Sequence, residues 1–205
     1  MKHEIERYII TGAPRSGKTT TIRELGKGFK TFEEPVVRII KQQIDRLRKD
    51  GEMGIPAYSQ PLEVIFPDLG DFLSQSQRLF MADYHEARLY DVSFFDRGMP
   101  DLIVLHELLD VPAPVDLIDI IRDHRYANNV FVFDLLDKDI FGQHINKRPA
   151  MFDSYERCKR IRDRIIEVYL QTRYSITIVP FDSVENRKLF VVRKISKSMM
   201  SDGGS

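Results

Sequence analysis

Residues 12–19 read GAPRSGKT, a glycine-rich stretch whose spacing suits it to hold phosphate. The stretch fits the pattern G-x-x-x-x-G-K-[ST], in which backbone N–H groups point at phosphate oxygens and the lysine reaches the β- and γ-phosphates. The hydroxyl of Thr19 is then the expected Mg²⁺ ligand. We predict a nucleotide site formed by nine residues of this loop: Gly12, Ala13, Pro14, Arg15, Ser16, Gly17, Lys18, Thr19 and Thr20. ATP is favoured over GTP as the nucleotide, because no N-K-x-D base-reading segment occurs where a GTPase would carry one.

An aspartate and an arginine stand together at the end of an apolar run, residues 92–96. They are Asp96 and Arg97 in the segment DVSFFDRGMPD. Phosphoryl transfer needs a carboxylate for the metal and a cation for the phosphate charge. Asp96 would orient Mg²⁺ through water, and Arg97 would bind a transferred or acceptor phosphate. The alternative is an ion pair that caps the next helix.

Two further acids end the run 29–32. In TFEEPVV, Glu33 and Glu34 precede Pro35, which is well tolerated in the first turn of a helix. Either carboxylate is a candidate general base, with Asp96 as a third. The alternative is that both are acids favoured at a helix N-terminus by the helix dipole.

Residues 137–153 form a connection that we expect to be mobile and to act as a lid. Arg148, with Lys147, would fold over the triphosphate and exclude water. Beyond the lid, one predicted helical face carries Arg157, Arg160 and Arg164, and a solvated face explains these arginines more simply than a role in the site. The predicted helix that precedes Asp96 carries weaker candidates for recognising the acceptor, which are Gln75, Gln77 and Arg78.

The elements that position these residues alternate along the chain. Apolar runs without clean alternation, typical of strands covered on both faces, occupy residues 8–11, 29–32, 92–96, 130–135 and 176–180. Segments with helical spacing lie between them. We predict an α/β fold with a parallel sheet and helices on both sides, as one domain over residues 1–198. Residues 48–71, rich in glycine and proline, read as a loop-rich insertion, and residues 199–205 as a disordered tail.

Composition limits the partners. Lys plus Arg and Asp plus Glu number 31 each, so no overall basic field draws the protein to nucleic acid or to a membrane surface. The N-terminal residues lack the features of a signal peptide, and no apolar stretch is long enough to span a membrane. We therefore expect a soluble, cytoplasmic protein, in which the single cysteine, Cys158, is a packing residue.

Taken together, GAPRSGKTT, EEPV, FFDRGMPD, an arginine-containing lid and the closing VPFDSVENR resemble the P-loop kinase-like proteins. Over nearly the whole chain the sequence resembles a family of stand-alone AAA-type predicted ATPases that look like the ribosylnicotinamide-kinase module. This resemblance implies a three-layer α/β/α sandwich with a five-stranded parallel sheet in the order 2-3-1-4-5. It also implies a monomer or homodimer, because 205 residues leave little room for the second helical domain of a ring-forming AAA+ protein.

A second resemblance is to the deoxynucleoside and thymidylate kinases. In those enzymes E-P-V after the second strand carries the base that takes the proton of the 5′-hydroxyl group. The match implies a base at Glu34, an acid–arginine pair at Asp96 and Arg97, and a lid arginine at Arg148. Their base-reading glutamine corresponds to either Gln75 or Gln77.

The leading hypothesis is a phosphotransferase that moves the γ-phosphate of ATP·Mg²⁺ to a small nucleoside- or nucleotide-like acceptor between Glu34 and Arg97. The alternative is a nucleotide-gated binding protein that hydrolyses slowly and recognises a macromolecular partner. A kinase needs Glu34, whereas a switch does not.

Overall fold

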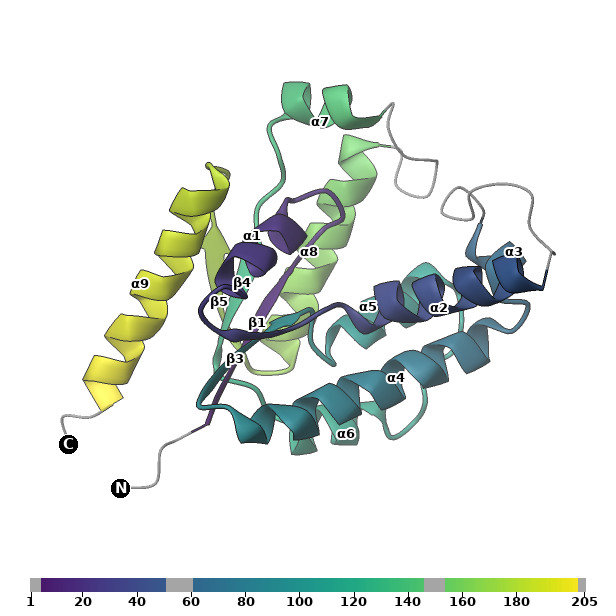
Figure 1. Cartoon of the computed structure of the whole chain (residues 1–205), viewed down its shortest axis with the longest axis horizontal. Coiled ribbons are helices and arrows are strands. Elements are labelled where there is room, and N and C mark those ends of the chain that lie inside the picture. Colours follow the sequence, from purple (N-terminus) through teal and green to yellow (C-terminus); the bar gives the residue numbers. More distant parts are fainter. Residues whose placement is uncertain (1–4, 51–60, 146–153, 203–205) are drawn as a thin grey trace.

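A computed structural model describes residues 5–50, 61–145 and 154–202, in which strands and helices alternate along the chain (Figure 1). In chain order the elements are β1 (Glu6–Gly12), α1 (Lys18–Leu25), β2 (Lys30–Phe32), α2 (Pro35–Lys49), α3 (Leu62–Ile65), α4 (Leu69–Glu86), the short 3₁₀ helix η2 (Ala87–Leu89), β3 (Val92–Asp96), α5 (Asp101–Leu108), α6 (Leu117–Asp123), β4 (Asn129–Phe133), α7 (Lys138–Ile145), α8 (Tyr155–Gln171), β5 (Ser175–Val179) and α9 (Val184–Asp202). The strands begin and end within two residues of the apolar runs.

The five strands form one parallel sheet in the order β2-β3-β1-β4-β5. In the register of the central strands, Ile9 lies opposite Phe95 and Ile10 lies opposite Phe131. Helices cover both faces, which explains why the strands read as continuous apolar runs. The predicted three-layer α/β/α fold with its kinase-like strand order is therefore confirmed.

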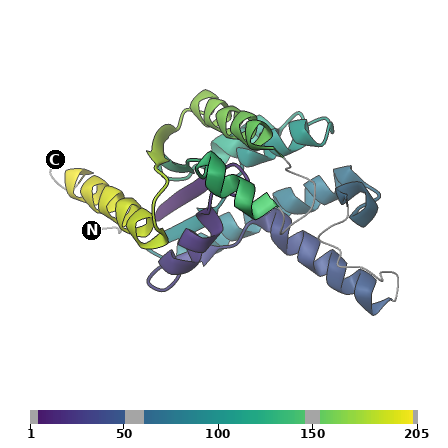
Figure 2. The ribbon, with the colours of Figure 1, turned by 90° about the horizontal axis from the view of Figure 1, so that it is seen from above.

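Alternate strand residues pack into two different layers. Ile10 and Phe94 face α1 and α9, whereas Ile9 and Phe95 face α4, α5 and α8. Seen from above, α1 and α9 lie on one side of the sheet and α5 and α8 on the other (Figure 2). All four strand side chains are at most 1% exposed, so each contributes about 1.5–3 kcal/mol of burial free energy. Cys158 is fully buried on α8, as expected for a packing residue.

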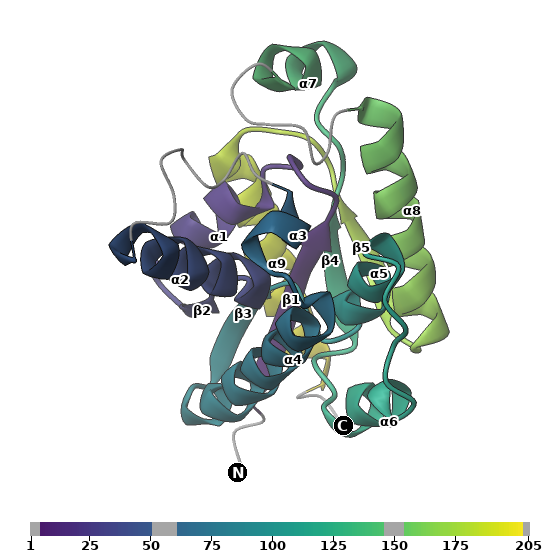
Figure 3. The same cartoon turned by 90° about the vertical axis from the view of Figure 1, so that its right-hand side faces the viewer.

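The predicted loop-rich insertion, residues 48–71, is partly helical. α2 continues to Lys49, α3 is a short helix, and α4 begins at Leu69 after an N-cap hydrogen bond to Asp68. Residues 51–60 lie outside the described part. The apolar residues of this region form a separate small core between α2, α3 and α4, which stand together in Figure 3. Burial of Leu62 and Ile65 in this core accounts for the helix that the prolines and glycines concealed.

The structure places a helix in the predicted lid connection and extends the last helix of the chain. Within the connection 137–153, residues 138–145 form the helix α7, which is held by Phe141; this side chain is 1% exposed and packs against Tyr155 with ring centroids 5.5 Å apart. Residues 146–153, including Lys147 and Arg148, lie outside the described part. At the other end, α9 continues to Asp202, beyond the predicted domain limit at residue 198. Among the described residues, none of the helices has the length and apolar character needed to cross a membrane.

Candidate active site

The predicted phosphate loop joins β1 to α1 in the centre of the sheet. Gly12 has φ of 141°, and a Cβ atom there would lie 2.7 Å from the Phe133 carbonyl oxygen, so only glycine fits. Gly17 is the N-cap of α1 in the left-handed conformation, and no side chain caps the helix. The N–H groups of the first turn are therefore left for a ligand, and the helix dipole favours an anion there.

Lys18 points back along the loop, and its side chain is almost completely buried. Its Nζ donates a 3.4 Å hydrogen bond to the carbonyl oxygen of Ala13. Burial lowers the pKa of Lys18, the Arg97 cation acts in the same direction, and nearby carboxylates oppose both. An ammonium group held among buried charges at this position is suited to contact a bound phosphate.

Asp96 and Thr19 meet at the carboxyl end of β3. The Thr19 hydroxyl donates a 3.1 Å hydrogen bond to Oδ2 of Asp96. The other oxygen, Oδ1, is buried without a hydrogen-bond partner, and the residue is 2% exposed. Burial raises the pKa of Asp96 to about 6, against the opposing effect of Lys18.

This pair fits a magnesium ion that completes its shell with phosphate and water. A hydroxyl oxygen and an unpaired carboxylate oxygen are hard donors of the kind that Mg²⁺ prefers. The described residues contain no group of three His, Cys, Asp or Glu side chains that could hold a metal by themselves. The remaining ligands of such an ion would come from the nucleotide and from solvent.

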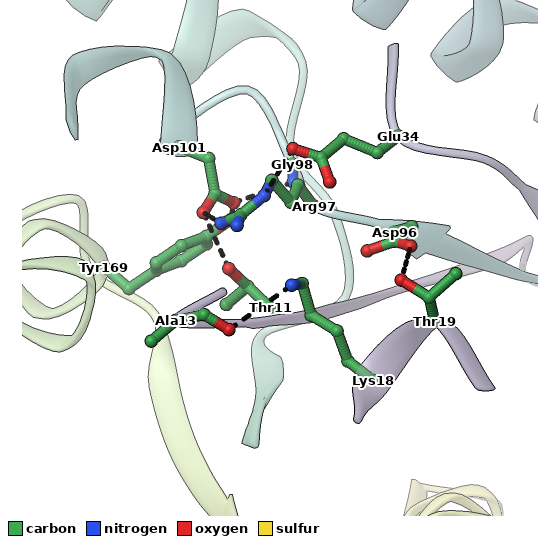
Figure 4. A network of polar contacts seen from close by, with 10 residues as sticks. All are labelled: Thr11, Ala13, Lys18, Thr19, Glu34, Asp96, Arg97, Gly98, Asp101 and Tyr169. Atoms are coloured by element: carbon green, nitrogen blue, oxygen red, sulfur yellow. Dashed lines mark hydrogen bonds and ion pairs between the residues drawn. The ribbon is translucent and has the colours of Figure 1, made fainter. Parts of the chain in front are cut away.

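Arg97 and Glu34 form an ion pair across the ends of β3 and β2, with Arg97 Nε donating to Glu34 Oε1 at 2.7 Å. Both side chains are about 15% exposed. Although burial opposes its charge, Glu34 and Asp101 together raise the pKa of Arg97 above its usual value. Arg97 also has φ of 74°, a strained conformation for a side chain of this size. The two neighbouring residues Asp96 and Arg97 therefore have different partners. Asp96 points to Thr19, whereas Arg97 points to Glu34 (Figure 4).

Glu33 and Glu34 point in different directions. Glu33 forms an ion pair with Lys41 of α2 on the partly exposed side of that helix, whereas Glu34 enters the network of Figure 4. Successive residues at a strand end point to opposite sides. Of these two candidate bases, the structure brings Glu34, and not Glu33, together with Arg97.

Asp101 is a residue of this network that sequence reasoning missed. Its carboxylate accepts hydrogen bonds from Thr11 Oγ1 at 2.6 Å, Tyr169 OH at 2.5 Å, Arg97 Nη1 at 3.0 Å and Gly98 N at 3.0 Å. The other three donors fix the buried Asp101 carboxylate, and this carboxylate in turn holds the Arg97 guanidinium in place (Figure 4). The sequence signal that could have identified Asp101 is its spacing, because it follows Arg97 by four residues in the segment FFDRGMPD.

A protein-family model described as an AAA domain matches residues 7–187 of the chain, from the first strand to the start of the last helix. The chain belongs to this AAA-domain family. No curated protein matches it.

Solved kinase structures share the fold of this AAA-domain protein at low sequence identity. The structure of deoxyadenosine kinase from M. mycoides with bound dATP is 15% identical with a TM-score of 0.62, and covers 93% of this chain and 99% of its own. Thymidylate kinase from Ehrlichia chaffeensis is 16% identical with a TM-score of 0.54, and covers 93% and 99%. Shikimate kinase from Acinetobacter baumannii, in complex with shikimate, is 11% identical with a TM-score of 0.50, and covers 99% and 97%. These matches confirm a P-loop kinase-like NTPase fold. The relation to ribosylnicotinamide kinase stays a prediction.

A second residue missed from the sequence approaches the phosphate loop of this AAA-domain protein from α9. Arg187 is 6% exposed, and its Nη1 donates a 2.9 Å hydrogen bond to the carbonyl oxygen of Ser16. The two residues are 171 positions apart in the chain. The sequence offers one signal for this residue, because Arg187 ends the segment VPFDSVENR that contributes to the resemblance to P-loop kinase-like proteins.

Other predicted residues lie apart from this network or outside the described part. Arg148 is not described, so its role as a lid arginine stays a prediction. Arg15 places its guanidinium 5.7 Å from the ring centroid of Phe141, which links the loop to α7, and Thr20 is exposed. The roles predicted for the loop residues 12–20 in binding nucleotide also stay predictions.

Three of the remaining candidates have partners away from this network: Arg164, Gln75 and Arg78. Arg157, Arg160 and Arg164 line a groove of about 250 Å³ between α5 and α8, where Arg164 pairs with Glu107. Gln75 and Arg78 both contact Asp71 on the exposed face of α4.

Proposed function

We propose that this protein is a phosphotransferase that moves the γ-phosphate of ATP·Mg²⁺ to a small acceptor resembling a nucleoside or a nucleotide. The observation that carries the proposal is the ion pair between Glu34 and Arg97, which stands beside Asp96 and opposite the phosphate loop. A hydrolase or a switch needs the loop and the metal site, but it does not need a largely buried glutamate paired with an arginine beside them. The kinase folds found among the solved structures support the same class of reaction.

Nucleotide binding is assigned to the residues around Lys18. The N–H groups at the start of α1 and the Lys18 ammonium group would hold the phosphates, while Thr19 and Asp96 would hold Mg²⁺ directly or through water. Bound Mg²⁺ supplies charge for the phosphate oxygens during transfer. The burial of Lys18 and Asp96 excludes water and strengthens these interactions.

Glu34 is proposed as the general base. Its carboxylate would take the proton from the acceptor hydroxyl as the oxygen of that group attacks the γ-phosphorus of ATP. The bond from this phosphorus to the β–γ bridging oxygen would break, and ADP would leave. Arg97 would keep Glu34 oriented through Nε and would offer its remaining N–H donors to the phosphate that is transferred or to one on the acceptor. Asp101 is a positioning residue in this scheme, because it touches Arg97 and not the reacting groups.

The acceptor class is inferred from two features. The segment EEPV and the Asp96–Arg97 pair resemble those of deoxynucleoside and thymidylate kinases, and solved kinases with such acceptors share this fold. ATP as donor rests on the missing GTPase base-reading segment. A cytoplasmic protein that is a monomer or homodimer remains our expectation.

The test is a screen of transfer with the full-length protein. ATP labelled at the γ-phosphate is incubated with Mg²⁺ and one candidate acceptor at a time: ribonucleosides, deoxynucleosides, nucleoside monophosphates, nicotinamide riboside, and shikimate as a sugar-like acceptor outside the proposed class. GTP is run in parallel as donor. We expect label to pass to one nucleoside- or nucleotide-like compound, with ATP preferred. Slow release of inorganic phosphate at the same rate with and without every acceptor would contradict a kinase and favour the nucleotide-gated binding protein.

A further inference from the structure

Arg187 packs against the phosphate loop from the side of α9. Its Nη1 donates to the Ser16 carbonyl oxygen at 2.9 Å, and its guanidinium lies 5.5 Å from the ring centroid of Phe133. The side chain therefore occupies the space between the loop, the end of β4 and the first turn of α9. At 6% exposure it is one of the most deeply buried cations of the chain.

The positive charge of Arg187 lacks an acidic partner among the residues that the structure describes. Within residues 5–50, 61–145 and 154–202, no carboxylate lies at ion-pair distance from Arg187, and its Nε is buried without a hydrogen-bond partner. Asp182 attracts the charge without forming an ion pair with it, and its Oδ1 accepts hydrogen bonds from Ser183 N at 2.6 Å and from Asn186 Nδ2 at 2.9 Å. Burial lowers the pKa of Arg187, with Asp182 opposing. An unpaired buried cation is costly, so a binding partner outside the described protein would relieve the cost.

The position of Gly17 shows where such a partner would lie. A Cβ atom on Gly17 would be 2.5 Å from Nη1 and 3.0 Å from Nη2 of Arg187. Gly17 is also the residue at which the uncapped helix α1 begins. The guanidinium thus touches the loop beside the N–H groups that are available to an anion. Glycine at 17 therefore serves two purposes, because it allows φ of 79° and leaves room for Arg187.

We propose that Arg187 belongs to the phosphate-binding site and that bound phosphates supply the negative charge which the protein does not place beside this arginine. The inference rests on the proposed function, because it takes a nucleotide phosphate chain as the ligand. Arg187 acts through its charge behind the loop and is a positioning residue for the phosphates.

The test compares Arg187→Met with Arg193→Met, which removes the same charge from an exposed position of the same helix. The affinities of the full-length proteins for ATP·Mg²⁺ and for inorganic triphosphate with Mg²⁺ are measured by calorimetry. The thermal midpoint is measured without ligand. We expect Arg187→Met to lose about tenfold or more in affinity for both ligands. Its midpoint without ligand should stay within about 2 °C of wild type, because a neutral side chain of similar length replaces an unpaired charge. Arg193→Met should match wild type throughout.

Several results would overturn the inference. A fall of many degrees in the unliganded midpoint of Arg187→Met with normal affinity, or a failure of this variant to fold, would mean that Arg187 is only a structural brace. Lost affinity for ATP with normal affinity for triphosphate would mean that the arginine acts on the nucleoside. Arg187→Lys, which keeps the charge, should retain affinity within about threefold of wild type, and a loss equal to that of the Met variant would argue against a role for charge.

These outcomes separate the inference from the proposed function. One possible result is that wild type binds triphosphate, Arg187→Met binds it more weakly, and wild type transfers phosphate to no acceptor. This result would support the inference and contradict the phosphotransferase. Wild-type protein that binds neither ligand would overturn both.

Discussion

Two buried arginines flank the phosphate loop, and they differ in how their charge is balanced. Arg97 donates to two carboxylates, Glu34 at 2.7 Å and Asp101 at 3.0 Å. Arg187 donates to one neutral carbonyl oxygen and has no ion pair within the described residues. The charge of Arg97 is balanced without a ligand, whereas the charge of Arg187 is not.

The buried aspartates of the site differ in the same way. Asp101 accepts four hydrogen bonds from the protein. Asp96 accepts one, from Thr19, and its second oxygen is unpaired. We infer that Arg97 and Asp101 maintain the structure of the site. Asp96 has an unpaired oxygen that is available to a metal ion, and Arg187 has an unbalanced charge that is available to phosphate. Removing a member of the first pair should therefore cost stability, and neutralising a member of the second should not.

The largest effect is expected for Arg97→Met. This substitution leaves Glu34 and Asp101 buried without their cation, which should lower the free energy of unfolding by about 3–5 kcal/mol. The comparison is with Arg187→Met, which should change it by less than about 1 kcal/mol. Urea unfolding of both variants at one pH gives the two values. Equal losses would remove the distinction between the two arginines.

A smaller loss is expected for Asp101→Asn. The amide keeps the size of the carboxylate but turns one acceptor into a donor, facing groups that also donate, so we expect a loss of about 2–3 kcal/mol in the free energy of unfolding. Tyr169→Phe removes one of the four donors and should cost about 1 kcal/mol in the same urea experiment. A loss for Tyr169→Phe as large as for Asp101→Asn would show that packing of the tyrosine, and not the carboxylate network, carries the effect.

A change of opposite sign is expected for Asp96→Asn. Because the pKa of Asp96 is about 6 when folded and lower when unfolded, its ionised form costs folding free energy above pH 6. This cost fades as the pH falls through 6 and is absent once both states are protonated. The substitution should therefore stabilise the free protein by about 1–2 kcal/mol at pH 8 and by less at pH 5, measured by urea unfolding at both values. Stabilisation that is equal at both pH values would show that the charge of Asp96 is not its cause.

The sequence predicts much of this site because its parts are local. The phosphate loop occupies eight consecutive residues, and Glu34, Asp96 and Arg97 each follow an apolar run that forms a strand. In a parallel sheet the carboxyl ends of strands meet at one edge, so local patterns suffice to bring these residues together.

The parts that the sequence does not predict depend on distant contacts. Asp101 is recognised as the anchor of Arg97 only when Thr11 and Tyr169, which are 90 and 68 residues away, are seen to donate to it. The role of Arg187 depends on a contact across 171 residues. The direction of Glu33 and Glu34 also needs the structure, because a difference of one residue at a strand end decides which side chain enters the site.

The central claim is tested most directly by following γ-labelled ATP with the best acceptor from the screen, using wild type, Glu34→Gln and Glu33→Gln side by side. Glu33→Gln is the matched control, because Glu33 pairs with Lys41 outside the network. We expect Glu34→Gln to lower transfer to the acceptor by about 10²-fold while ATP affinity stays within about twofold, the result of losing a general base. Glu33→Gln should transfer at the wild-type rate. Transfer by Glu34→Gln at that same rate would contradict the assignment of Glu34 as the base, and label that appears only in inorganic phosphate would contradict the phosphotransferase itself.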